Sequence, residues 1–141
     1  MQSELQTASR PDMDIEEDIT VSLRNFAPLR TARGFLSYQS TNGHVKISGN
    51  VGSPQSKIVL LDFVQKIPGV IDSDMNDLHD DEEIRLNVGQ LVPPGVLVSV
   101  QFGTVILSGS LPNDIAELLH RVRSVKGIRK VVLSYHGATV A

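Results

Sequence analysis

Cysteine and tryptophan are absent from this chain of 141 residues, and aromatic residues make up only 4% of it. Without cysteine there can be no disulfide, no thiolate metal site, no cysteine nucleophile and no lipidated cysteine. No stretch approaches the roughly 20 apolar residues of a membrane-spanning helix, and residues 1–10 lack the apolar core of a secretory signal. The compartment stays open: cytoplasmic or peripheral to a membrane as the sequence stands, and envelope or periplasm if a signal was removed.

Strong positive charge is also missing. The formal net charge is −3, which has the wrong sign for a protein that binds duplex nucleic acid through its phosphates. Residues 49–52 match the Gly-x-x-Gly pattern of KH domains, but that loop joins two helices, whereas here it joins a strand to a helix. We therefore expect no nucleic acid as a partner.

What the sequence does contain is a strand motif that occurs twice. Residues 43–49 read Gly-His-Val-Lys-Ile-Ser-Gly and residues 103–109 read Gly-Thr-Val-Ile-Leu-Ser-Gly. The alternation of apolar residues between turn-forming glycines predicts a half-buried strand in each case. The residues that follow repeat as well, from Pro54 and Pro112 to Gly69 and Gly127. The chain is therefore predicted to hold two copies of one unit.

Each unit is predicted to read helix, strand, strand, helix, strand. In the first, the helix begins at Asp14 and ends at Pro28, residues 29–34 form a loop, and Thr41-Asn-Gly43 turns a hairpin. In the second, the helix begins in the acidic run 77–83, where residues 81–84 repeat the pattern of residues 16–19. The expected fold class is α+β, with two small α/β sandwich units packed together. The expected boundaries are a flexible tail over 1–13, units over 14–76 and 77–137, and a tail over 138–141.

This ordered set, found twice over residues 14–136, resembles the BON domain, which is named for bacterial osmotic-stress and nodulation proteins. The resemblance rests on the Gly-x-Val-x-Leu/Ile-Ser-Gly strand, the proline-started helix, the closing Gly-Val or Gly-Ile, and the preceding acid-capped helix. It implies a domain without catalytic activity, placed in the bacterial envelope, that binds phospholipid membranes or attaches to other domains. The third strand of the first unit departs from the pattern, because it is acidic where alternating apolar residues are expected.

Catalytic and metal sites are not predicted. The histidines, at positions 44, 79, 120 and 136, have no ligand spacing, and consecutive carboxylates after His79 point in different directions from a helix. We interpret residues 77–83 as the solvated start of a helix, and expect no metal, no cofactor and no enzymatic activity. Glycines expected at turns and helix ends, where positive φ or a close approach is needed, are Gly43, Gly49, Gly69, Gly103, Gly109 and Gly127.

Basic residues are concentrated late in the chain. On a helical projection Arg121 and Arg123 flank the buried stripe, so that their stems can cover apolar surface while their charges reach outward. An anionic lipid surface would suit them, and a solvated rim with acidic neighbours is the alternative. The candidate residues for binding lipid or another anion are Arg121, Arg123, Lys126, Arg129 and Lys130.

The two long helices differ at two aligned positions. Val59 aligns with Glu117 and Phe63 aligns with Arg121, so the first unit is apolar where the second is charged. Val59 and Phe63 are one helical turn apart and form a second face beside the buried stripe. We expect the other repeat or another subunit to cover this face. Two hypotheses follow: a non-enzymatic module that binds a phospholipid surface or a protein partner, or a structural protein that associates with itself.

Overall fold

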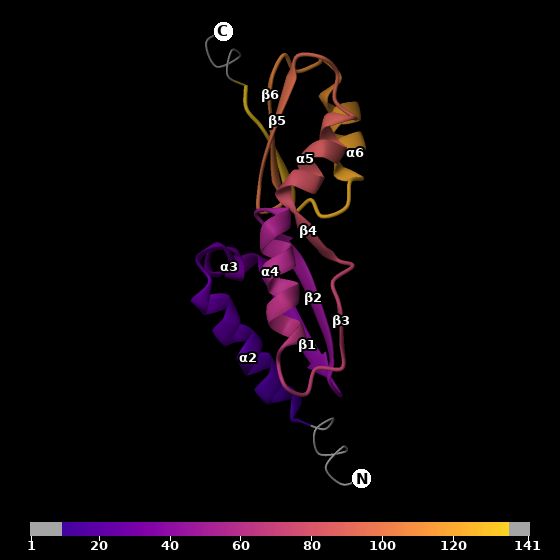
Figure 1. Cartoon of the computed structure of the whole chain (residues 1–141). Helices are drawn as coiled ribbons and strands as arrows, with labels where there is room; N and C mark the ends of the chain where they lie inside the picture. Colours follow the sequence, from indigo (N-terminus) through magenta and orange to yellow (C-terminus); the bar gives the residue numbers. More distant parts are fainter. Residues whose placement is uncertain (1–9, 136–141) are drawn as a thin grey trace.

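The computed structural model of the protein describes residues 10–135, which form two α+β units arranged end to end (Figure 1). Each unit has a small sheet with helices packed on one face, and each has its own aliphatic core. The expected fold class is therefore confirmed. Residues 1–9 of the tail expected over 1–13, the tail expected over 138–141 and His136 lie outside the described residues.

The first unit has two helices and a hairpin before its long helix. Its elements are α2 (Asp12–Asn25), α3 (Ala27–Ala32), the 3-10 turn η1 (Arg33–Phe35), β1 (Leu36–Thr41), β2 (His44–Val51), α4 (Pro54–Gln65) and β3 (Asp72–Asp74). Strand β1 pairs antiparallel with β2, and β3 pairs parallel with β2 on its other side. Ser53 caps α4 by accepting a hydrogen bond from the N–H of Ser56, and Pro54 is the first helical residue, as predicted.

The second unit starts inside the sheet of the first. Strand β4 (Leu78–Asp80) pairs parallel with the end of β2 and leads directly into α5 (Asp81–Gly89). The chain continues through β5 (Val96–Gln101), β6 (Thr104–Gly109), α6 (Ile115–Arg123) and β7 (Lys130–Leu133). Strand β6 lies between antiparallel β5 and parallel β7. Strands β3 and β4 both pair with β2 in the first sheet, and the predicted boundary after residue 76 falls between them.

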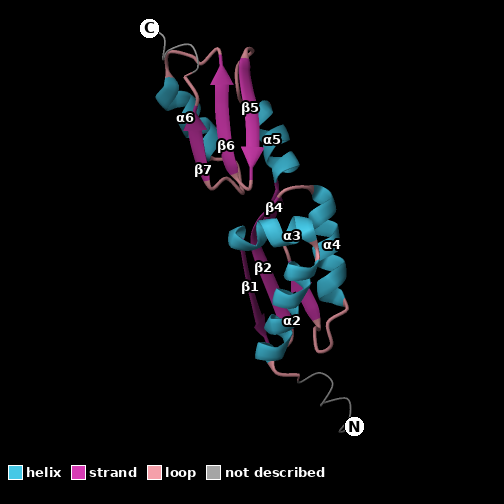
Figure 2. Cartoon of the chain, turned by 90° about the vertical axis from the view of Figure 1, so that its left-hand side faces the viewer, coloured by secondary structure: helices cyan, strands magenta, loops and turns pink. Residues whose placement is uncertain are grey.

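Helices cover one face of each sheet. In the first unit Ile15, Ile19 and Leu23 follow one stripe of α2 and are fully buried against β2 and α4. In the second unit the corresponding stripe of α5 is Ile84 and Val88, which pack with residues of β6 and α6. In Figure 2 strands β5, β6 and β7 lie in front of α5 and α6, so among the described residues 10–135 no helix lies on the outer face of the second sheet.

Four sequence predictions are wrong in detail. Pro28 does not end helical structure, because it occupies the first turn of α3, where a missing N–H costs nothing. The loop predicted over residues 29–34 is therefore helical, with α3 continuing to Ala32 and η1 following it. Helix α2 begins at Asp12 and not at Asp14, so residues 12 and 13 do not belong to a tail. The alignment predicted between α2 and α5 is also wrong by one helical turn. Asp81 corresponds to Asp12 and not to Glu16, because both aspartates accept hydrogen bonds from the hairpin turn of their unit.

Candidate interaction surfaces

An aspartate at the start of the first helix holds the hairpin turn in each unit. The N–H groups of Asn42 and Gly43 donate to the Asp12 carboxylate at 2.8 and 3.0 Å. The N–H groups of Phe102 and Gly103 donate to the Asp81 carboxylate at 2.7 and 3.0 Å. The hydroxyl of Ser40 also donates to Asp12, and these hydrogen bonds hold the pKa of the Asp12 carboxyl below its ordinary value. The repeated contact defines the structural register between the units.

Phe102 takes an unusual backbone conformation at the second turn. Its φ is 47° and that of Gly103 is 81°, as in the primed hairpin turns that favour asparagine and glycine. A bulky residue at positive φ is strained. The Phe102 ring, however, stacks on Phe35 of the first unit, with centroids 4.8 Å apart and planes 5° from parallel. The strained residue therefore lies where it joins the two units.

Polar and cationic contacts complete this junction. Arg129 lies over the Phe35 ring, with its guanidinium carbon 4.6 Å from the centroid. Asn50, which is 3% exposed, donates from Nδ2 to the carbonyl of Gly127 at 2.8 Å. A Cβ on Gly103 would lie 2.6 Å from Asn50 Nδ2, and one on Gly127 would lie 2.7 Å from His79. The junction is close-packed, and it fixes the two units relative to each other.

The acidic run 77–83 is structural and only partly solvated. Asp80 and Asp81 are 6% and 9% exposed, which contradicts the prediction of a solvated face for these two residues. Asp80 caps α5 by accepting the N–H of Glu83 at 2.8 Å, while His79 pairs with the Glu83 side chain at 3.3 Å. Within residues 10–135, no group of three or more histidines and carboxylates is placed to hold a metal ion.

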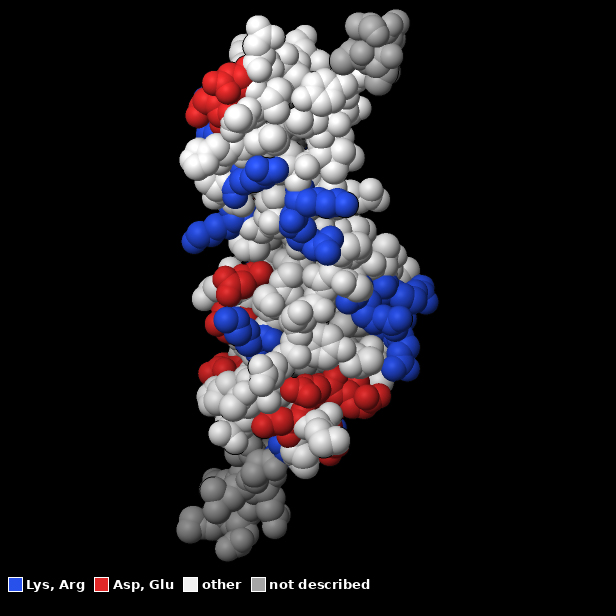
Figure 3. Space-filling view, turned by 180° about the vertical axis from the view of Figure 1, so that it is seen from behind, with Lys and Arg blue, Asp and Glu red and all other residues white. Residues whose placement is uncertain are grey.

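The predicted basic residues do not form one cluster. Arg129 is at the junction, whereas Arg121 donates from Nη1 to the carbonyl of Leu91 at 3.1 Å and pairs with Glu117. Arg123, Lys126 and Lys130 are exposed. On the face seen in Figure 3 the basic side chains lie in several separate groups, with acidic ones between some of them.

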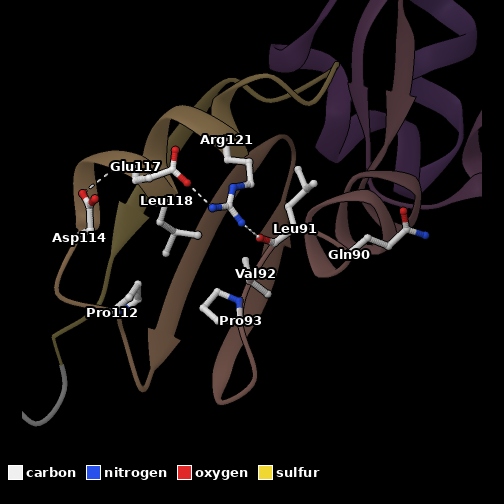
Figure 4. A pocket seen from close by; sticks show the side chains of 9 residues that line it. All are labelled: Gln90, Leu91, Val92, Pro93, Pro112, Asp114, Glu117, Leu118 and Arg121. Atoms are coloured by element: carbon white, nitrogen blue, oxygen red, sulfur yellow. Dashed lines mark hydrogen bonds and ion pairs between the residues drawn. The ribbon is translucent and has the colours of Figure 1, made fainter.

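Arg121 lines a pocket of about 330 Å³ between the end of α5 and the start of α6. Figure 4 shows its guanidinium reaching across the pocket, with Leu118 and Val92 beneath it. The pocket is open to solvent and combines an apolar floor with one ion pair. Its lining residues are Gln90, Leu91, Val92, Pro93, Pro112, Asp114, Glu117, Leu118 and Arg121.

The apolar second face of α4 is covered from within the first unit. Phe63 meets Phe26 edge to face, with ring centroids 6.2 Å apart, and both Phe63 and Val59 pack against the first core. Phe26 lies at the corner between α2 and α3. The expectation that the other repeat or a second subunit covers this face is therefore wrong for the part that Phe26 touches. The rest of Phe63 lines a groove of about 340 Å³ between α2 and α4.

Helix α3 explains why the aligned positions differ. The segment from α5 to β5 in the second unit, residues 90–95, contains no helix that would correspond to α3. The helix face that α3 and Phe26 cover in the first unit borders the solvent-open pocket in the second unit, and there it carries Glu117 and Arg121. The covered face is therefore apolar and the solvent-facing one is charged.

The six glycines named from the sequence all have positive φ, between 80° and 120°, and Gly95 is a further one at 93°. Two of them, Gly103 and Gly127, also lie at the junction. The sequence alone did not predict that Asp12 and Asp81 hold the hairpin turns. Nor did it predict the junction residues Phe35, Asn50 and Phe102. A signal was available for the two aspartates, since each precedes the first buried isoleucine of its helix by three positions.

Comparison with known proteins bears on the fold. No family model and no curated protein matches this chain. Among the solved structures that match are two of CdsD, described as a structural protein of the type III secretion system of Chlamydia trachomatis, one of them as its C-terminal domain. The TM-score is 0.67 in both cases. This chain has the same fold. The similarity covers 84% and 91% of this chain, and at 17% identity it shows the fold alone. This chain spans only 64% and 66% of the length of those two structures.

Proposed function

We propose that this chain is a non-enzymatic structural module of the bacterial envelope that associates with copies of itself. The observation that carries the proposal is its fold likeness, over most of its length, to a structural protein of a bacterial secretion system. The repeated αββαβ order also agrees with the tandem BON resemblance, which remains part of the proposal. Attachment to other protein domains would follow from the BON resemblance.

The internal contacts support a structural role. The side chains most suited to chemistry are used to hold the fold: Asp80 caps α5, Asp81 holds a hairpin, and His79 pairs with Glu83. Two units fixed by a packed junction keep their outer surfaces in a constant relation to each other. Such a body suits assembly, because several contacts can then be made at once without loss of conformational freedom.

Phospholipid binding is the second candidate, and one observation favours it. Arg123, Lys126 and Lys130 are exposed in the second unit, and each basic residue near an anionic surface contributes about 1 kcal/mol. Against it, Arg121 is paired with Glu117 and Arg129 lies over Phe35. Within residues 10–135 no helix has the length and hydrophobicity needed to cross a membrane.

Sedimentation of the purified protein from micromolar to millimolar concentration tests self-association directly. We expect the mean mass to rise with concentration, and a monomer throughout would refute the proposal. Co-sedimentation with anionic and neutral vesicles at two salt concentrations tests the second candidate. Binding to anionic vesicles that disappears at high salt and in an Arg123→Glu, Lys126→Glu variant would establish lipid binding.

A further inference from the structure

The outer faces of the two sheets differ in a way that the shared fold does not require. The hairpins align residue for residue, so that Leu97 and Ile106 of the second unit correspond to Ser37 and Lys46 of the first. The parallel pairing places Val132 beside Ile106, just as it places Asp74 beside Lys46. Three outward positions are therefore aliphatic in the second unit and polar in the first.

These three side chains form an apolar stripe across the sheet. Ile106 is on the central strand with Val132 directly opposite, and Leu97 is opposite Ser108, which is two residues along the same strand from Ile106. Leu97 is 63% exposed and Val132 is 39% exposed. Helices α5 and α6 cover the other face of this sheet (Figure 2). The stripe therefore faces solvent.

The charge on this face suits a second copy of the same face. Its outward positions include one charged residue, Lys130, and otherwise serine, threonine, glutamine and the three aliphatic residues. Depletion of charge at the centre is typical of protein interfaces. A two-fold axis over Ile106 that runs along the strands would place Lys130 over Gln101 of the other copy. An axis that runs across the strands would place Lys130 over Ser134. No like charges would meet.

From these observations we infer that the outer face of β5, β6 and β7, centred on Leu97, Ile106 and Val132, packs against the same face of a second copy. Sheets packed in this way lie about 10 Å apart, with their side chains interdigitated. The inference rests on the proposed self-association and names its surface. A three-stranded face of this length covers on the order of 300 Å², well below the roughly 800 Å² per partner of a standard interface. The association is therefore weak by itself.

Leu97→Asp tests the surface, and Ser37→Asp at the matching position of the first unit is its control. Leu97 is the most exposed of the three aliphatic residues, so a charge there leaves the core intact, and thermal melting by circular dichroism checks this. In sedimentation to millimolar concentration we expect Leu97→Asp to remain monomeric, while Ser37→Asp associates like the unmodified protein. Equal association of the unmodified protein and Leu97→Asp would overturn the inference while leaving self-association in place. A monomeric unmodified protein would refute self-association itself.

Because the chain has no cysteine, a single introduced thiol reports on symmetry. A bis-maleimide with a spacer of roughly 10 Å should cross-link Ile106→Cys into a dimer, because residue 106 meets its own copy near the axis across sheets about 10 Å apart, whereas Lys46→Cys should give no dimer. If Leu97→Asp abolishes association but Ile106→Cys does not cross-link, the face binds a different surface of the second copy. That result would overturn the face-to-face arrangement.

Discussion

Replacing Asp81 with alanine should destabilise the second unit and its junction with the first. The carboxylate is 9% exposed and accepts the N–H groups of Phe102 and Gly103 at 2.7 and 3.0 Å. A hydrogen bond to a charged group contributes about 1.5–3 kcal/mol. The two bonds go to the two oxygens of one carboxylate, so their contributions are not independent, and the partly exposed Phe102 N–H can regain water. We therefore expect a loss of about 3 kcal/mol in the free energy of unfolding.

The loss is measurable by urea unfolding followed by far-ultraviolet circular dichroism, since the chain lacks tryptophan. With a urea dependence of about 2 kcal/mol per molar, the midpoint of Asp81→Ala should fall by roughly 1.5 M. Glu82→Ala is the matched control, because Glu82 is exposed and, among the described residues, its side chain pairs only with Arg85 in the same helix. Its midpoint should shift by less than about 0.3 M. Equal shifts in the two variants would refute the role assigned to Asp81.

Three further outcomes are expected. Phe63→Glu should lower the free energy of unfolding by about 2 kcal/mol, because it places a charge against an aromatic ring and the first core. Ile58→Glu is the control, since Ile58 of α4 is 60% exposed and its replacement should change the melting temperature little; similar melting curves for the two variants would contradict the contact assigned to Phe63. Gly103→Ala should lower the free energy of unfolding, because φ is 81° and the new Cβ would meet Asn50. Gly89→Ala is its control: the new Cβ would meet no neighbouring side chain within 4 Å, and the free energy of unfolding should rise by about 0.5 kcal/mol. The lowered pKa of Asp12 means that its stabilising contribution is present at neutral pH and is lost as the pH falls through the folded-state pKa. Asp12→Asn should therefore show a smaller fall in melting temperature below about pH 4 than the unmodified protein.

Elements that depend on neighbours along the chain are predictable from the sequence. Both hairpins, the start of α4 at Pro54 and the division into two αββαβ units follow from the period of apolar residues and from glycines at turns. These features are local, because a strand or a capped helix shows its pattern within about ten residues. Comparing one repeat with the other also located Phe63 as a residue with a special environment.

The contacts of Phe63, Asn50 and Asp81, in contrast, depend on how distant parts of the chain pack together. Phe63 contacts Phe26, which lies 37 positions earlier in the chain. Asn50 and Gly127, which share a hydrogen bond, are 77 positions apart. A short helix such as α3, with Pro28 in its first turn, has little stability of its own, so its formation depends on burying Leu29 and Ala32. Likewise, an acidic run is solvated by default, and Asp81 is buried only because the fold places a hairpin turn with two free N–H groups beside it. Contacts of this kind depend on how the elements pack, and no local pattern encodes them.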